Sequence, residues 1–329
     1  MSTRIRELAE GVVAGNRRSL ARAITLTEST RSEDAAHAQE LLKTLLPHSG
    51  RGVRIGISGV PGAGKSTFIE SFGLYLVEQG RRVAVLAVDP SSSISGGSIL
   101  GDKTRMQKLS QAEQAYIRPS PSSGIAGGVN RRTREAMLVC EAAGYDTVLV
   151  ETVGVGQSEI EVASMTDFFM LIMLPNAGDE LQGIKKGILE LADCLVVNKI
   201  DTDKAAAGRT ASQLKTALHF MRPRTPDWTI PILMCSALEN LGLPKVLESI
   251  EEFGRVTKSE SPDGVFNTRR RNQNRDWMWS LAREAILKSF QEHPEVRARW
   301  PVLEQEVKDG STTAVLAAEE LVELFGRKG

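Results

Sequence analysis

The sequence has few cysteines, and their placement argues against a disulfide framework. Only three occur in 329 residues, at Cys140, Cys194 and Cys235, and each lies in an apolar segment. An odd number of widely spaced cysteines predicts buried free thiols in a reducing compartment. The sequence also has no CxxC or CxH pair, and its four histidines are scattered, which disfavours a soft metal centre.

An excess of charge and a long hydrophobic run are missing as well. Lysine plus arginine and aspartate plus glutamate both number 41, which disfavours non-specific binding to nucleic acid or to an anionic membrane. The most apolar run, 168–175, is far shorter than the roughly 18–20 residues that cross a bilayer. The N-terminal MSTRIRELAEG lacks the apolar core of a signal peptide. We therefore predict a soluble, cytoplasmic protein.

The sequence does contain enough apolar material for a sizeable core. Hydrophobic residues make up 41% of the chain and charged residues 25%, which is typical of a folded globular protein. The length fits two domains, and it fits one large domain with helical extensions equally well.

Short β-rich runs alternate with helical stretches in the middle of the chain. The runs lie at 53–58, 83–88, 147–152, 168–174, 194–198 and 230–235. Near-continuous apolar strands separated by helices are typical of a parallel sheet that is covered on both faces. We predict that 51–257 forms a doubly wound α/β domain with a mostly parallel sheet.

Helical patterns precede this domain. Residues 1–50 are predicted to form an N-terminal helical extension, in which Ser32 is the N-cap of a helix that ends before Pro47. Apolar residues recur at helical spacing in two stripes, the first made of Ile5, Leu8 and Val12 and the second of Ala35, Ala38, Leu42 and Leu45.

Helical patterns also follow the domain, over 258–329. A linker, SESPDG, precedes helices predicted at 275–293 and 312–325. The stretch 277–290 is apolar around most of its circumference, so such a helix must be buried on more than one side. A dimer contact and ordinary packing within the chain both satisfy that need, and we interpret the segment as a dimerisation arm.

A phosphate-binding loop is the strongest motif in the sequence. The segment GVPGAGKS at 59–66 fits GxxxxGK[ST] and lies directly after a predicted strand and before a predicted helix. Its glycines let backbone N–H groups surround phosphate oxygens at a helix N-terminus. Lys65 is predicted to bridge the β- and γ-phosphates and Ser66 to offer its hydroxyl to Mg²⁺. The predicted phosphate contacts are Gly62, Ala63, Gly64, Lys65, Ser66 and Thr67.

Acidic residues at strand ends complete a predicted magnesium site. Asp89 ends one strand, and Glu151 ends another within ETVG, where Gly154 can donate its N–H to the γ-phosphate. Between these strand ends, residues 91–105 are polar and rich in glycine, as in a switch loop. Asp102 within it is a direct or indirect magnesium partner, or a carboxylate that caps the loop. We predict Lys65, Glu151 and Gly154 as the catalytic groups.

A guanine pocket is predicted from two further strand ends. The sequence NKID at 198–201 matches NKxD, in which Asp201 accepts the two N–H donors that guanine offers and adenine lacks. Lys199 is predicted to cover the ring with its alkyl stem, and Asn198 to brace the phosphate loop. The sequence SAL at Ser236, Ala237 and Leu238 is predicted to contact the guanine oxygen through its backbone.

The order of these motifs resembles the P-loop GTPases, and the strand that ends at Asp89 resembles the SIMIBI class. Longer stretches are similar to the MeaB-like (ArgK-type) GTPase chaperones of adenosylcobalamin-dependent methylmalonyl-CoA mutase. These stretches are GNRRSLARAITLTES at 15–29, GVPGAGKST at 59–67, AVDPSSSISGGSILGDKTRM at 87–106, ETVGVGQSE at 151–159 and NKIDTDKAAA at 198–207. The resemblance covers almost the whole chain.

The resemblance implies a homodimeric, Mg²⁺-dependent GTPase that binds GTP and GDP and associates with a mutase. It implies a chaperone that gates cobalamin loading and protects or reactivates the mutase, with no cobalamin bound directly by the chaperone. It places magnesium at Ser66, Asp89, Asp102 and Glu151. It also marks 176–187 as a further switch near the partner, although a plain polar loop fits this segment too.

One residue departs from Ras-like GTPases, and other functions stay open. Val155 stands where Ras-like enzymes carry the glutamine that positions the attacking water, so slow intrinsic hydrolysis is expected. Gln157 is not assigned that role. A nickel-delivering GTPase would need clustered soft ligands, and a transport-associated kinase would use the same phosphate loop. A non-catalytic scaffold would have lost a loop or magnesium residue, and none is lost.

Overall fold

A computed structural model describes residues 3–89, 106–121, 128–152, 158–175, 186–258 and 263–326, with the backbone alone at 88–89, 119–121, 128–130, 158 and 186. Contacts divide the chain into two compact units, Met1–Arg269 and Arg270–Gly329. The boundary falls inside α13 (Val265–Glu292), and the N-terminal helices belong to the first unit. Most of the predicted linker at 259–264 lies outside the described residues.

A seven-stranded sheet forms the centre of the first unit, and all its described pairs are parallel. Its strand order is β3-β2-β4-β1-β5-β6-β7. The doubly wound α/β fold is therefore confirmed. The strands are β1 (Val53–Gly59), β2 (Val83–Asp89), β3 (Ala115–Pro121), β4 (Thr147–Thr152), β5 (Phe168–Met173), β6 (Cys194–Val197) and β7 (Ile232–Met234).

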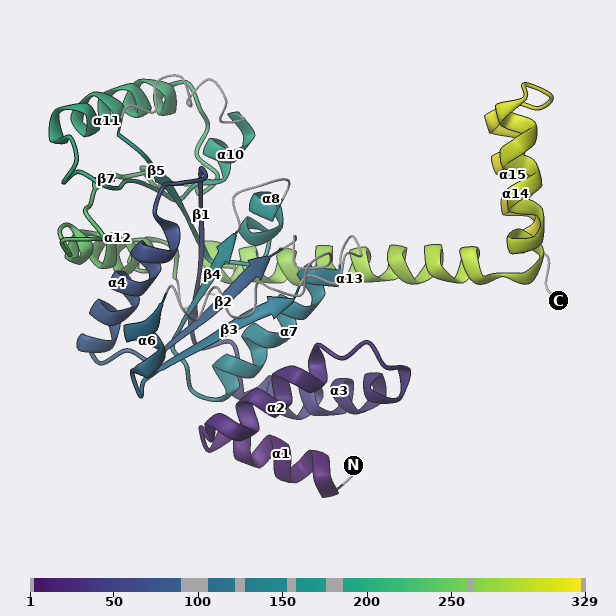
Figure 1. Cartoon of the computed structure of the whole chain (residues 1–329), viewed down its shortest axis with the longest axis horizontal. Coiled ribbons are helices and arrows are strands. Elements are labelled where there is room, and N and C mark those ends of the chain that lie inside the picture. The colour runs from purple at the N-terminus through teal and green to yellow at the C-terminus, as the bar shows by residue number, and fades with distance from the viewer. Residues whose placement is uncertain are drawn as a thin grey trace. The chain divides into compact units, whose positions relative to one another are not determined.

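Helices cover both faces of this sheet (Figure 1). Apolar side chains of α4 (Lys65–Glu78), α6 (Gln107–Gln111) and α12 (Leu243–Thr257) pack on one face. Those of α7 (Gly128–Ala142), α8 (Ser158–Ala163), α10 (Lys186–Leu191) and α11 (Lys204–His219) join the core of the other face. Burial on both faces explains why every residue of β4, β5 and β6 is buried.

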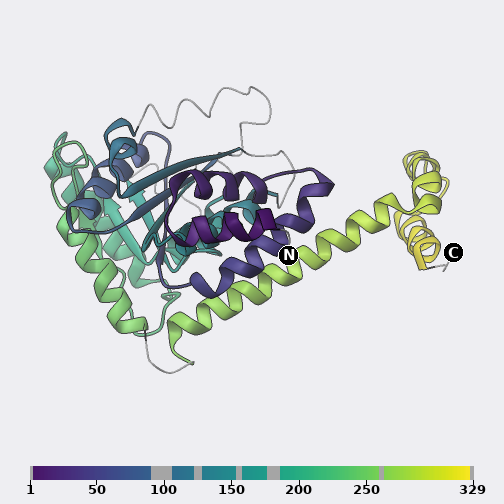
Figure 2. The same cartoon turned by 90° about the horizontal axis from the view of Figure 1, so that it is seen from below.

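Three N-terminal helices extend the second of these cores, and Figure 2 shows them lying together. They are α1 (Thr3–Val13), α2 (Arg17–Thr27) and α3 (Ser32–Leu45), followed by a 3₁₀ turn, η1 (Leu46–His48). A largely buried ion pair joins Glu28, at the end of α2, to Arg118 on β3. The predicted helical extension at 1–50 therefore packs on the sheet domain as part of the same unit.

Two details of the N-terminal prediction were wrong. Ser32 is the first residue of α3, and Arg31 occupies the N-cap without a side-chain hydrogen bond. The predicted stripe included Ala35, which is exposed, whereas Leu41 is fully buried in its place. The buried face of α3 is therefore rotated relative to the predicted stripe, and it consists of Ala38, Leu41, Leu42 and Leu45.

Proline obscured two elements in the sequence. Strand β3 contains Pro119 and Pro121 and was not predicted, yet it pairs with β2 along its whole length. It lies at the edge of the sheet, where a missing backbone donor is tolerated. Helix α14 (Pro294–Lys308) was also missed: it begins at Pro294, where proline is favourable, and continues through Pro301.

The second unit contains the rest of α13, α14 and α15 (Ala314–Gly326). Phe290 packs edge-on against Trp300 and Phe325, and Arg299 pairs with Glu306 and Glu320. These contacts hold the end of α13 to the α14–α15 pair.

The three cysteines are free and buried, as the sequence predicted. Burial raises the pKa of Cys235 to about 12 and also raises the pKa values of Cys140 and Cys194. Thiolate chemistry is therefore suppressed at all three.

Close packing of α8 on β1 gives a test of this fold. A Cβ atom at Gly56 would come within 2.7 Å of Thr166 Oγ1, 2.8 Å of Val162 Cγ1 and 2.9 Å of Phe169 Cδ2. We expect Gly56→Ala to lower the free energy of unfolding by about 1–3 kcal/mol through overpacking, measured by denaturant unfolding. Gly208→Ala is the control, because nothing lies within 4 Å of its added methyl group in α11. Equal stability of Gly56→Ala and the wild type would contradict the packing.

Candidate functional site

The phosphate loop joins the carboxyl end of β1 to the N-terminus of α4. Gly62 and Gly64 adopt positive φ angles of 80° and 82°, in the left-handed region that side chains rarely enter. A Cβ atom at Gly59 would lie 2.3 Å from the carbonyl oxygen of Ile172, so only glycine fits beside β5 there. Ala63, a residue of the loop itself, is fully buried. The loop thus has the tight glycine turns that the motif predicted.

Lys65 begins α4 and lies inside the loop. Its Nζ atom donates to the carbonyl oxygen of Gly59 at 2.8 Å and more weakly to that of Val60 at 3.4 Å. Burial lowers the pKa of Lys65, while the charges of Glu151 and Glu159 oppose that shift. The two carboxylates therefore favour the charged ammonium, which is the form that binds phosphate.

Ser66 and Glu151 meet beside this lysine. The Ser66 hydroxyl donates to Glu151 Oε1 at 3.0 Å, and Glu151 is 8% exposed on β4. A hydroxyl and a carboxylate oxygen this close are the hard oxygen ligands that Mg²⁺ prefers, so the pair fits the predicted metal. No group of three or more histidine, cysteine, aspartate or glutamate residues suited to a metal occurs in the described part of the chain. Magnesium at a phosphate loop needs no such group, because phosphate and water supply its other ligands.

The remaining predicted phosphate-side residues are only partly described. Asp89 is the last residue of β2, and its backbone places it at the same sheet edge as Gly59 and Glu151. Asp102 and Gly154 lie outside the described residues, as do Val155 and Gln157. Thr67 lies in the first turn of α4 and is exposed.

Asn198 connects the phosphate loop to the base motif. Its Nδ2 atom donates to the carbonyl oxygen of Ala63 at 2.9 Å, and its Oδ1 atom accepts from the N–H group of Ala237 at 3.0 Å. The side chain is 1% exposed, so both bonds form away from water. One carboxamide therefore fixes the spacing between loop, NKID segment and SAL segment.

Lys199 lies over the phosphate loop in a strained backbone conformation. Its φ angle is +59°, which is uncommon outside glycine. A Cβ atom at Gly64 would lie 3.5 Å from Lys199 Cε, so the lysine stem passes next to the loop. Strain at this position is consistent with a side chain placed for binding rather than for stability.

Asp201 and Ser236 lie together at the predicted base pocket. Ser236 Oγ donates to Asp201 Oδ1 and accepts from the N–H group of Glu239. Asp201 is exposed, which leaves its other oxygen open to a base, and Leu238 exposes 76% of its surface. Ser71, which the sequence analysis did not identify, donates from α4 to the carbonyl oxygen of Ala237 at 2.6 Å. No motif marks Ser71, because a serine within a helix is ordinary.

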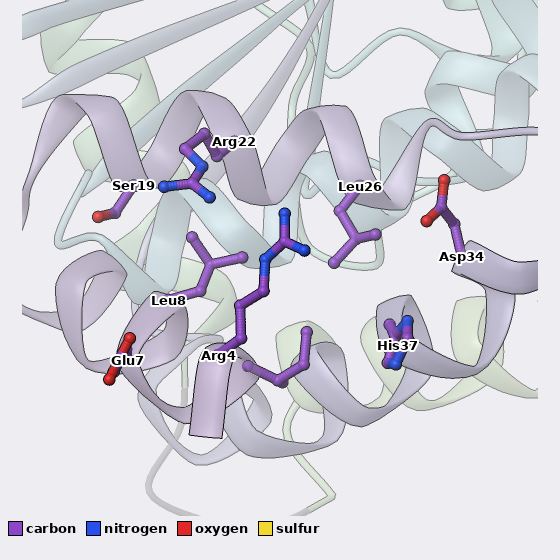
Figure 3. A pocket seen from close by; sticks show the side chains of 9 residues that line it. Arg4, Glu7, Leu8, Ser19, Arg22, Leu26, Asp34 and His37 are labelled. Carbon is purple, nitrogen blue, oxygen red and sulfur yellow. The ribbon is translucent and has the colours of Figure 1, made fainter. Parts of the chain in front are cut away.

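A separate hollow of about 350 Å³ lies among α1, α2 and α3 (Figure 3). Arg4 and Arg22 reach it from α1 and α2, and Asp34 and His37 border it from α3. None of the predicted site residues lines it, so the carboxyl ends of the strands are the better candidate for the functional site. None of the helices in the described ranges combines the length and apolar character needed to span a bilayer.

Comparisons with known proteins identify relatives of this chain. A family model described as "Methylmalonyl Co-A mutase-associated GTPase MeaB" matches residues 20–295. A protein of Caulobacter vibrioides is 53% identical over 322 residues, which cover 98% of each chain. "Methylmalonic aciduria type A homolog, mitochondrial" of Mus musculus is 46% identical over 97% of this chain and 79% of its own length. A crystal structure of "LAO/AO transport system kinase" has a TM-score of 0.80 and 35% identity over 99% of both chains.

The base pocket yields a prediction about specificity. We expect Asp201→Asn to weaken GDP binding by about 10²-fold and to favour xanthosine diphosphate, because a carboxamide can donate to the xanthine oxygen. Calorimetric titration with both nucleotides measures the change. Asp203→Asn is the matched control, since Asp203 caps α11 through a hydrogen bond that asparagine can also make. Retained preference of Asp201→Asn for guanine would show that the base is read elsewhere.

Proposed function

Because the chain belongs to the MeaB family of methylmalonyl-CoA mutase-associated GTPases, we propose that it serves a cobalamin-dependent mutase as a GTP-hydrolysing chaperone. It is a P-loop GTPase, and a role linked to the mutase follows from the family. We propose further that its nucleotide state gates cobalamin loading and that it protects or reactivates the mutase. The observation that carries the proposal is the joining of phosphate loop and guanine motif by Asn198, in a chain of this family.

The site residues support hydrolysis through positioning and electrostatics. The glycine turns aim backbone N–H groups at the phosphates, and Lys65 supplies a positive charge at their β–γ end. Ser66 and Glu151, with Asp89 and Asp102 as further candidates, would hold Mg²⁺, which neutralises charge that develops on the phosphate oxygens. Lys65 Nζ donates to Gly59 O and Val60 O in this structure, and we propose that it exchanges these carbonyls for phosphate oxygens when a nucleotide binds.

Slow intrinsic turnover is the property that makes a partner useful. The side chain of Val155 offers no hydrogen-bonding group to the attacking water, so a partner that adds a stabilising group to the site could raise the rate. Residues 176–187 are proposed to contact that partner. Residues 176–185 lie outside the described structure.

Homodimer formation through the C-terminal arm is also proposed. Met278, Trp279, Ile286 and Leu287 on α13 each expose more than half of their surface. Large apolar side chains at this density favour an interface over packing within one chain. A second copy of the chain is the partner that we propose for this face.

A transport-associated kinase is the second candidate, because the chain resembles a structure named for that activity. Such a kinase would transfer phosphate to a protein side chain, whereas a GTPase transfers it to water. Recovery of the released phosphate as inorganic phosphate distinguishes the two. A nickel-delivering role has weaker support, because all three cysteines are buried.

Stimulation by the mutase is the first test of this proposal. We expect turnover in a phosphate-release assay to rise as purified methylmalonyl-CoA mutase is titrated in, by up to roughly 10³-fold if the mutase completes the site. Cobalamin transfer should then differ between the GDP-bound protein and the protein bound to a non-hydrolysable GTP analogue. Lys65→Ala with mutase is the control for contaminating phosphatases. If saturating mutase left the rate of GTP turnover unchanged, and if cobalamin transfer did not depend on the bound nucleotide, the proposed chaperone role would be refuted.

Truncation tests the dimerisation arm. A chain that ends at Gln273 keeps Arg269, whose guanidinium forms a buried ion pair with Asp193 at 3.1 Å. We expect this truncated protein to sediment as a monomer and to bind GDP with unchanged affinity. Trp279→Ser together with Leu287→Ser in the full chain is the matched surface variant and should also be monomeric. A dimeric truncated protein would place the contact elsewhere.

A further inference from the structure

GTP hydrolysis requires a group that accepts a hydrogen bond from the attacking water. The side chain after Gly154 cannot supply it, because Val155 has an apolar side chain. Two carboxylates act electrostatically on Lys65, those of Glu151 and Glu159. Glu151 Oε1 already accepts a hydrogen bond from Ser66. Glu159 is the last residue of the stretch ETVGVGQSE at 151–159, and no role has been assigned to it above.

Glu159 is a buried carboxylate with an unpaired oxygen. It lies in the first turn of α8 and is 8% exposed. Its Oε2 atom is buried and accepts no hydrogen bond in the described structure. By contrast, the buried carboxylates of Glu141 and Asp193 are paired with Arg54 and Arg269, and Glu135, whose Oε2 is also unpaired, is held by Arg131 through Oε1. An empty buried acceptor is unfavourable for folding, and a water molecule that it binds is one explanation of its presence.

The position of α8 places this carboxylate at the phosphate end of the site. Helix α8 packs on β1 and β4, whose carboxyl ends carry the phosphate loop and Glu151. It covers the face of the sheet opposite α4, the helix that begins with Lys65 (Figure 1). Helices α4 and α8, which carry Lys65 and Glu159, therefore flank this part of the sheet from opposite faces.

We propose that Glu159 holds the attacking water, with Oε2 accepting a hydrogen bond from it. The water oxygen forms the new bond to the γ-phosphorus, and the bond to the bridging oxygen breaks with its electron pair left on GDP. Both hydrogens of the water leave with inorganic phosphate, so Glu159 orients the water without consuming a proton. The inference rests on GTP hydrolysis by this chain and requires no partner.

Single-turnover hydrolysis without mutase tests the inference. Glu159→Met keeps a similar side-chain volume and removes the acceptor oxygen, and we expect it to slow the chemical step by about 10²-fold. Affinity for GDP should stay unchanged. Glu159→Gln should recover most of the rate, because its amide oxygen can still accept from water. Glu161→Met is the matched control on the same helix and should hydrolyse GTP at the wild-type rate.

Other results of these hydrolysis and binding measurements would separate a failure of the Glu159 assignment from a failure of GTPase activity itself. A wild-type rate in Glu159→Met would overturn the inference while leaving the GTPase intact. A loss of rate matched by an equal loss of GDP affinity would make Glu159 a support for Lys65 or for the fold instead. If Glu159→Gln hydrolysed GTP as slowly as Glu159→Met, the charge of Glu159 would matter rather than its ability to orient water, and the inference would also be overturned. Absence of hydrolysis in the wild type itself would refute GTPase activity, not this assignment alone.

Discussion

Two hydrogen bonds of the Asn198 carboxamide join the halves of the nucleotide site. Its donor binds Ala63 in the phosphate loop, and its acceptor receives the N–H group of Ala237 in the SAL segment. Both bonds are buried, so losing the side chain would leave a carbonyl and an N–H group unsatisfied. Asn198 therefore links the phosphate contacts directly to the base contacts, and Ser71 on α4 adds a second bond to the SAL segment.

The parallel sheet makes this arrangement possible. Carboxyl ends of parallel strands meet at one edge, so the loop after β1, Glu151 on β4 and the motif after β6 converge although they are far apart in the sequence. Buried strands give these ends a rigid support, because the sheet is covered on both faces. Helix α8, which carries Glu159, is also held against the sheet, because Val162 of α8 packs closely on Gly56 of β1.

The sequence could predict which described segments come together at this site, because its motifs are constrained by backbone geometry. Positive φ angles at Gly62 and Gly64 demand glycine, and a buried carboxamide at Asn198 has few substitutes. Strand β3 could not be predicted, because prolines exclude a central strand but are tolerated at an edge. Glu159 was missed for a different reason: a glutamate in a polar segment is ordinary, and its burial follows from the packing of α8 on β1 and β4.

The central claim is that one side chain couples phosphate binding to base recognition, and calorimetric titration of GDP into Asn198→Ala tests it most directly. We expect the dissociation constant to rise by about 10–100-fold, since one or two buried polar groups lose their partners. Tripolyphosphate, which has no base, should also bind more weakly, because the phosphate loop loses its brace at Ala63. Unchanged affinity for both ligands in a folded variant would contradict the claim.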